Sequence, residues 1–447
     1  MMTGDAAATP SRRWRWETLT GGGAVLQEDA FRRLWLGRLF SLTALNAVLY
    51  TLLVLAVGDG NGASIKSALF ITAYLLPTAT LGTFSGVLVD RLPKNLVLMG
   101  VSAARFGLML MLLMSATSLW TVYGVALLIA MTSQFSGPAE AAALPQVVRS
   151  DQFTVANSTN NFGGLIAQVV GFAVLAPLFL NTVGPRPLFF VSGILFAVAG
   201  GFFITIHTLG SLRVDMDETV DAVRDVRKQF AEAWQILSRD VAAYMCVIMV
   251  VLSGTASLVA ATLMPRFTQD ILDVPVKNAI YLYLPATLGI VAGLRTVHLF
   301  ERRLPRGALV GGGFALLMAA LVCLALTKTI AAGLSGMTGL DVTPARIATA
   351  ICFSTIAAFA TPVIGIASRS LVNERVPMGI QGRVFAAQTV LGNLASIPPI
   401  LFAGVLSELV GVAPVMLLTV VILICAAGWT LAQAVSRPRE LDDATAA

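Results

Sequence analysis

Twelve runs of apolar residues, each long enough to cross a bilayer, dominate this 447-residue sequence. About 20 helical residues span the roughly 30 Å hydrocarbon layer. Hydrophobic residues make up 57% of the chain and charged residues only 12%, which is more apolar surface than a water-soluble core of this size can bury. Because lipid offers no hydrogen-bond partners, spanning segments must be helices. The sequence therefore predicts an all-α membrane protein with twelve transmembrane helices, at 34–57, 65–89, 96–116, 119–139, 156–181, 187–209, 240–264, 276–297, 308–330, 346–370, 384–407 and 413–436.

Positive charges are distributed unevenly around these runs. If the N-terminus is cytoplasmic, 22 of the 30 lysines and arginines fall on the cytoplasmic side and six on the other, with Arg38 and Arg105 inside spans. This bias follows the positive-inside rule. We therefore expect a multi-pass protein of the cell membrane (inner or plasma) with both termini cytoplasmic. The net charge of +6 then reflects topology and contact with membrane lipids, and no nucleic-acid partner is expected.

One long polar interval, 210–239, divides the spans six and six. Val220, Val223, Phe230, Trp234 and Leu237 recur in it at roughly helical spacing, with acids leading and cations following. This pattern predicts an amphipathic helix that lies on the cytoplasmic surface as a tether, although a partner-binding role stays open. The expected organisation is a cytoplasmic tail (1–33), a six-helix bundle (34–209), the linker (210–239), a second six-helix bundle (240–436) and a second tail (437–447).

The second half of the chain repeats features of the first. Each half has a proline (Pro77 or Pro285), then Ala-Thr-Leu-Gly and a second glycine four residues on, and then an acid, a cation and Leu-Pro. A further echo joins Leu144-Pro145 to Val376-Pro377, and three such echoes in the same order favour a parallel duplication. We therefore expect two pseudo-symmetric six-helix bundles, with a substrate site between them near the membrane midplane. The glycine pairs, Gly82 with Gly86 and Gly289 with Gly293, would permit close helix contact.

The first of these loops carries a recognisable motif. Gly86, Asp90, Arg91 and Lys94 resemble motif A of the major facilitator superfamily, with Pro93 where the motif has glycine. The chain is more specifically similar to the branch of drug and macrolide-efflux proteins and siderophore exporters. That similarity rests on Pro138-Ala139, Ala142, Pro145, Val148, Ala156-Asn157, Gly382-Arg383-Val384-Phe385-Ala386, Gly404-Val405-Leu406 and Gly411.

The resemblance implies a gating role for the charged loop. In the superfamily, the motif A acid contacts the start of the eleventh span when the cytoplasmic side is shut. Asp90 would then face a positive helix N-terminus and Arg383 in one conformation only. The alternative is that these are topology-setting loop charges. The predicted latch residues are Gly86, Asp90, Arg91, Lys94, Glu301, Arg302, Arg306 and Arg383.

Polar side chains inside spans are costly and are therefore candidates for a substrate cavity. Asn157, Asn161 and Gln168 share one face of the fifth span, and the superfamily places its first, fifth, seventh and eleventh spans around the cavity. Hydrogen bonding between helices is the alternative for these side chains. The predicted cavity residues are Arg38, Asn46, Asn157, Asn160, Asn161, Gln168, Gln388 and Asn393, and Arg105 is predicted to be a structural charge.

Acids are scarce inside the predicted spans. Asp59, Glu140 and Glu408 all lie near span ends, and Asn46 stands where the resembling branch often has an acid. Coupling therefore stays open: protons could act through Glu140 or Asp90, another ion could be used, or the protein could be a facilitator. The neutral lining favours an amphiphilic or bulky apolar substrate.

These observations favour a secondary active transporter that exports small amphiphilic or hydrophobic molecules by alternating access. Lipid or lysolipid transport, and a non-transporting receptor or scaffold, are the alternatives. No catalytic grouping and no phosphate-binding loop occur, so an enzyme is not expected. The four cysteines of the chain are far apart in apolar runs, and we expect no metal site, no disulfide and no cofactor. The expected partners are a small-molecule substrate and lipids, with the chain a monomer.

Overall fold

The computed structural model describes residues 25–58, 61–114, 118–206, 235, 237, 240–275, 280–338 and 341–436. The predicted tails, apart from the segment after residue 24, and nearly all of the predicted linker helix lie outside the described residues. Leu237 from the end of the linker is buried in the apolar core of the second bundle.

The described part of the chain is helical, as predicted. In the first half the helices are α2 (Asp29–Val57), α3 (Ala63–Arg91), α4 (Lys94–Met114), α5 (Leu119–Val147), α6 (Phe153–Gln168), α7 (Ala176–Thr182) and α8 (Pro185–Ile204). In the second half they are α10 (Val241–Asp270), α11 (Ile280–Glu301), α12 (Arg306–Ala325), α13 (Thr327–Thr338), α14 (Val342–Arg375), α15 (Met378–Val410) and α16 (Val412–Ser436). Short helical turns, η1 (Val25–Gln27) and η2 (Ser150–Gln152), precede α2 and α6.

Twelve of these segments correspond to the twelve predicted spans. Among the described residues, eleven segments are long and apolar enough to cross a membrane. The twelfth is α11, which is 22 residues long. The prediction of an all-α protein with twelve transmembrane helices is confirmed.

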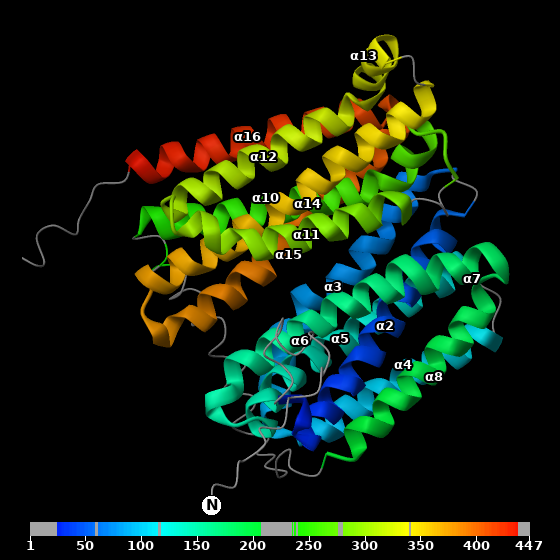
Figure 1. The fold of residues 1–447 in the computed structure, drawn as a ribbon, viewed down its shortest axis with the longest axis vertical. Coiled ribbons are helices and arrows are strands. Elements are labelled where there is room, and N and C mark those ends of the chain that lie inside the picture. Colours follow the sequence, from blue (N-terminus) through cyan, green and yellow to red (C-terminus); the bar gives the residue numbers. More distant parts are fainter. Residues whose placement is uncertain are drawn as a thin grey trace, which may run out of the picture.

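The helices form two bundles (Figure 1). Helices α2 to α8 make one bundle and α10 to α16 the other, and each has its own apolar core. The two bundles converge toward the end that carries α7 and α13 and diverge toward the end from which the chain leaves α16. With the topology predicted from the positive charges, the converging end is the outer side of the membrane.

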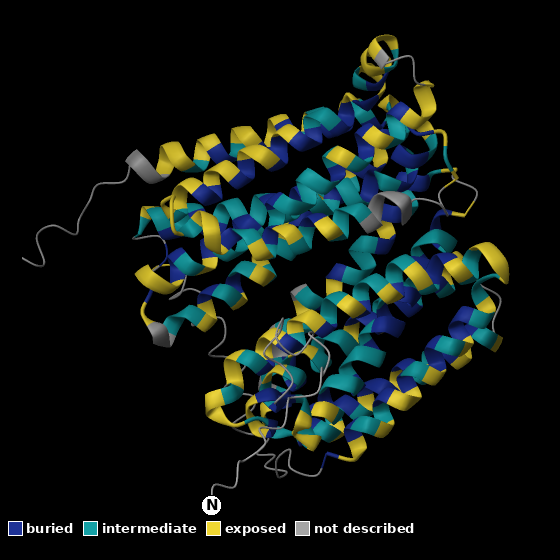
Figure 2. Cartoon of the chain, viewed as in Figure 1, coloured by how far each residue is buried: buried dark blue, intermediate teal, exposed yellow. Residues whose placement is uncertain are grey.

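Exposed residues are spread along the outer faces of both bundles (Figure 2). Many are large and apolar: Phe190 on α8 and Trp429 on α16 expose more than half of their surface. A soluble protein would rarely leave so much apolar surface in water, but lipid tails cover it in a membrane.

The fifth span is interrupted. Between α6 and α7 the chain forms a π-helix, η3 (Val169–Leu175), which packs against α2 and also touches α11 of the other bundle. A Cβ on Gly171 would lie 2.3 Å from the Thr43 carbonyl oxygen, so only glycine permits this approach of η3 to α2. Such π-helical turns are often found at functional sites.

Two elements differ from the expected spans. Helix α5 continues to Val147, eight residues past the expected end at 139, because its prolines Pro138 and Pro145 are accommodated inside it. A separate helix, α13, follows α12 on the predicted outer side, although a single span was expected over 308–330.

The glycine pairs behave differently in the two halves. Cβ atoms on Gly289 and Gly293 would lie 2.3 Å and 2.6 Å from carbonyl oxygens of α14, so α11 and α14 pack backbone to backbone there. Gly82 has only ordinary neighbours, and no described atom lies within 4 Å of a Cβ on Gly86. The expectation of close contact therefore holds for the second pair and is wrong for the first.

This difference predicts unequal effects on stability. Gly289→Ala would force its Cβ against the Thr355 carbonyl, and such overpacking costs about 1–3 kcal/mol. Gly86→Ala meets open space and is expected to leave the melting temperature in detergent unchanged or raise it slightly. Equal melting temperatures for the two variants, measured by scanning fluorimetry, would contradict the close α11–α14 contact.

Candidate functional site

The two bundles meet mainly through α3, which packs against α15 and α10. Ala68 and Leu75 of α3 are part of the apolar core of the second bundle. Helix α11 adds a smaller contact with η3. A substrate site between the bundles must therefore lie beside these contacts.

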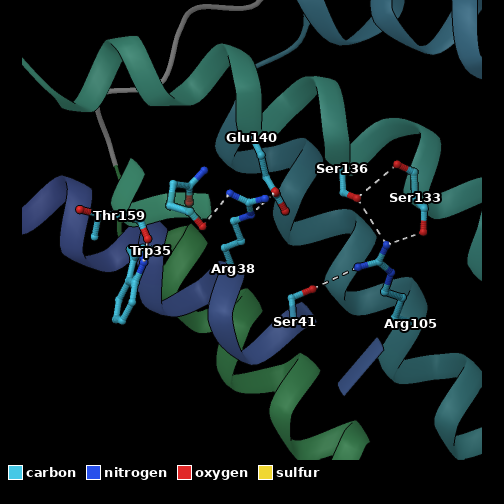
Figure 3. A network of polar contacts seen from close by, with 9 residues as sticks. Trp35, Arg38, Ser41, Arg105, Ser133, Ser136, Glu140 and Thr159 are labelled. Atoms are coloured by element: carbon cyan, nitrogen blue, oxygen red, sulfur yellow. Dashed lines mark hydrogen bonds and ion pairs between the residues drawn. The ribbon is translucent and has the colours of Figure 1, made fainter. Parts of the chain in front are cut away.

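An ion pair joins two helices inside the first bundle (Figure 3). Arg38 of α2 places its Nε 2.8 Å from Oε2 of Glu140 on α5, and its Nη1 donates to the Asn160 carbonyl at 3.4 Å. The side chains of Arg38 and Glu140 are 21% and 14% exposed. Glu140 was predicted to lie near a span end. The longer α5 instead puts it seven residues inside the helix.

Arg105 of α4 is buried among hydroxyl groups, and Figure 3 shows its guanidinium pointing between α2 and α5. Its Nε donates to Thr132 Oγ1 at 3.0 Å, its Nη1 to Ser41 Oγ at 3.1 Å, and its Nη2 to Ser133 Oγ at 2.9 Å and Ser136 Oγ at 3.4 Å. One planar side chain therefore ties together three helices. This geometry supports the predicted structural role of Arg105.

The predicted polar face of the fifth span is visible on α6. Asn157 and Asn161 are exposed one turn apart, while the neighbouring face, with Thr159 and Gly163, packs against Trp35 of α2. Gln168 is partly buried at the end of α6, directly before the π-helix.

Two further predicted cavity residues form hydrogen bonds near α6 and η3, Asn160 through its backbone and Asn46 through its side chain. Asn160 contributes its carbonyl oxygen to Arg38. Asn46 donates to the Leu42 carbonyl of its own helix at 2.8 Å, and its Cβ faces Gly171 of η3. Asn46 therefore lies at the crossing of α2 and η3.

In the second bundle, the predicted residues Gln388 and Asn393 line one cavity. It has a volume of about 190 Å³ and lies at the mid-length of α10 and α15. Thr389, Ser396 and the apolar side chains Val250, Val251 and Leu258 complete most of its wall. The Oε1 atom of Gln388 is buried and has no hydrogen-bond partner. Buried polar atoms are normally paired, so among the described residues this acceptor is an exception in the cavity wall.

A larger cavity of about 560 Å³ lies between α10, α12 and α16. Its lining consists of apolar side chains and a glycine, among them Met249, Phe314 and Ile424. Such a space can hold an apolar chain but has no side-chain group to orient a polar substrate.

The residues of the first predicted latch occupy the end of α3 and the start of α4. Lys94 is buried and its Nζ donates to the carbonyls of Val89, Asp90 and Leu92 at 2.7–3.0 Å, so it caps the end of α3. The Pro93 carbonyl accepts from two amides of α4 and begins that helix. Gly86 and Arg91 are half-buried, and Asp90 is exposed. Among the described residues, none pairs with the Asp90 carboxylate.

The second predicted latch lies at the turn between α11 and α12. Arg306 forms an ion pair with Glu374 of α14, within its own bundle. Glu301 has one oxygen 3.4 Å from His298 Nδ1, while Arg302 and, on α15, Arg383 are exposed. A latch role for all eight residues stays a prediction, because the bundles converge at the opposite end, which the positive charges predict to be the outer side.

The profile of the Major Facilitator Superfamily matches residues 34–399. The chain belongs to this superfamily. It is therefore a membrane transporter, and its family and structural neighbours are transporters rather than enzymes.

Solved structures of two transporters of this fold are similar to it. The nucleoside transporter NupG matches with 14% identity and a TM-score of 0.66, over 92% of this chain and 100% of that one. A bacterial homologue of the human lysosomal transporter Spinster, in an inward-facing and unoccupied conformation, matches with 13% identity and a TM-score of 0.65, over 91% of this chain and 97% of that one. At these identities the likeness shows the fold alone. No curated protein matches the sequence.

Two polar features of this superfamily member were not predicted from the sequence, the ion pair in the first bundle and the hydroxyls of the cavity wall. The Arg38–Glu140 pair joins residues 102 positions apart, and Thr389 and Ser396 look like ordinary helix hydroxyls. If the predicted fourth span had extended past residue 139, Glu140 would have been placed inside the bundle, one helix turn from Ser136. Among the described residues, no group of three or more His, Cys, Asp or Glu side chains could hold a metal.

The hydrogen bonds of Arg105 to three helices predict that a lysine, which keeps only the positive charge, cannot replace it. Arg105→Lys keeps the positive charge but loses the planar fork that reaches three helices, and leaves buried hydroxyls without their donor. We expect a loss of about 2 kcal/mol, seen as a melting temperature several degrees lower in detergent. The exposed Arg186→Lys is the matched control. Equal melting temperatures for both variants would contradict the structural role predicted for Arg105.

Proposed function

We propose that this transporter exports small, uncharged or weakly charged amphiphilic molecules by alternating access, as in the drug and siderophore-exporting branch that its motifs resemble. The observation that carries the proposal is the cavity between α10 and α15. It presents four neutral polar side chains on an apolar wall, and one of them, Gln388, has an unpaired acceptor.

The chemistry of this cavity selects among substrate classes. Amide and hydroxyl groups can orient a ligand, but they offer no charge to offset the desolvation of an ion. The apolar side chains Val250, Val251 and Leu258 instead favour an apolar body. A molecule with one polar region and a bulky apolar region fits both parts, whereas a small anion does not.

The position of the cavity suits alternating access. It lies at the mid-length of two helices that face the other bundle, as expected for a substrate site at the midplane. The bundles converge on the predicted outer side (Figure 1), so the site would communicate with the cytoplasm in this conformation. A cytoplasmic substrate could then enter, and the opposite conformation would release it outside.

The ion pair Arg38–Glu140 is our candidate for proton coupling. A carboxylate inside a span is stabilised there mainly by its partner, so protonation of Glu140 would release Arg38. Arg38 also holds the Asn160 carbonyl of α6, which connects the pair to the fifth span. Proton binding at Glu140 would thereby alter the contact between α2 and α6.

Transport assays in proteoliposomes test the substrate class. With amphiphilic dyes and drugs as substrates, we expect Gln388→Leu to raise KM about tenfold or more, because a buried hydrogen bond to the ligand is lost. The control Gln146→Leu changes an exposed glutamine that bonds only to its own helix. Protein abundance and orientation are matched by immunoblot and protease protection.

Two outcomes would contradict this assignment. Wild-type KM values for Gln388→Leu would exclude the α10–α15 cavity as the substrate site. Flux of lysolipids without flux of any dye or drug would replace drug-like export by lipid transport.

The coupling role of Glu140 is tested separately. Glu140→Gln cannot lose or gain a proton, so we expect accumulation driven by a pH gradient to fall to the level of downhill exchange, with downhill exchange retained. Glu374→Gln, which alters the ion pair with Arg306 near a helix end, is the matched control. Full gradient-driven accumulation by Glu140→Gln would exclude this pair from coupling.

A further inference from the structure

The first turn of α3 has no cap of its own. Its N-cap residue is Gly62, with φ of 65°, and it offers no side-chain acceptor to the first amides of the helix. The Ser64 amide donates instead to Oε1 of Glu408 at 3.0 Å. Glu408 belongs to α15 of the other bundle. A carboxylate is the most favourable acceptor at a helix N-terminus, so one bundle caps a helix of the other.

The second oxygen of Glu408 is held within its own bundle. Its Oε2 forms an ion pair with Nη1 of Arg266 on α10, and the Nε of Arg266 lies 2.8 Å from Oδ2 of Asp270 on the same helix. Glu408 and Arg266 are each 21% exposed. Arg266 therefore fixes the carboxylate while its other oxygen reaches α3.

The helix backbones approach closely one turn before Glu408. A Cβ on Gly404 would lie 2.6 Å from the Ala68 Cβ and 3.0 Å from the Ser64 carbonyl oxygen. In the same turns of α3, the hydroxyls of Ser64 and Ser67 are buried and have no hydrogen-bond partner in the part of the chain that the structure describes. Such hydroxyls gain partners when water enters, so they favour opening and the contact needs an interaction that opposes it.

We propose that Glu408 is the latch of the predicted outer side: it caps α3 across the bundle interface when that side is closed, and the cap is lost when that side opens. This inference rests on the alternating access of the proposed function. It also relates the two ends of the α3–α15 contact. Asp90 ends α3 and Glu408 ends α15, and the helices run in opposite directions. Each therefore carries a carboxylate that the N-terminus of the other can bind in one conformation.

Distances between spin labels on the two bundles test the latch. In a background with all four cysteines replaced by serine, Val183→Cys and Met337→Cys report on the outer side, and Ser150→Cys with Leu304→Cys on the cytoplasmic side. All four positions are exposed. Double electron–electron resonance on purified protein in nanodiscs, without substrate or pH gradient, gives the populations of the two conformations.

Glu408→Gln is expected to raise the fraction with a long outer and short cytoplasmic distance about tenfold. Gly404→Ala is expected to shift it the same way through steric clash, and so checks the interface without changing charge. Asp270→Asn is the matched control, because it alters the partner of Arg266 without touching α3. Asp90→Asn is expected to shift the populations in the opposite direction.

An unchanged outer distance in Glu408→Gln, or an equal shift in Asp270→Asn, would overturn the latch. A shift of the populations in Glu408→Gln without one in Asp90→Asn would support the proposed outer latch and contradict the predicted cytoplasmic one. Because no substrate is present, absence of export for every compound tested would refute the proposed function without affecting this result.

Discussion

The antiparallel contact of α3 with α15 is the interaction on which the rest of this transporter depends. It joins two bundles that otherwise have separate apolar cores, and it places the start of one helix beside the end of the other. Near the predicted outer end, Gly404 brings the backbones together and the Glu408 carboxylate bridges them. Glu408 lies near the end of its helix and is 21% exposed, so this bond across the interface competes with water.

The two bundles differ in the polar groups that they bury. The first holds Arg105 among hydroxyls and the Arg38–Glu140 pair, which tie α2, α4 and α5 together. The second places neutral side chains around its mid-length cavity. This division separates the charges that could respond to protons from the surface that could bind a substrate. The fifth span belongs to the first bundle, and its π-helix touches α11 of the second.

The spans could be predicted because length and apolarity decide what can cross a bilayer, and the two-bundle architecture followed from the repeated Ala-Thr-Leu-Gly segments. Side-chain partners could not be predicted in the same way. Glu140 was placed at a span end because its helix was ended too early. Gly86 matched Gly293 by pattern, yet only Gly293 meets a neighbouring backbone. The capping of α3 by Glu408 depends on packing between residues 344 positions apart.

Access to the fifth span from each side of the membrane tests the account most directly. In a cysteine-free background, Asn161→Cys on α6 would be exposed to a membrane-impermeant maleimide in vesicles of known orientation. The account predicts labelling from the cytoplasmic side in the resting protein, and labelling from the outer side only after Glu408→Gln opens that side. Labelling of the resting protein from the outer side alone would contradict both the predicted topology and the closed outer interface.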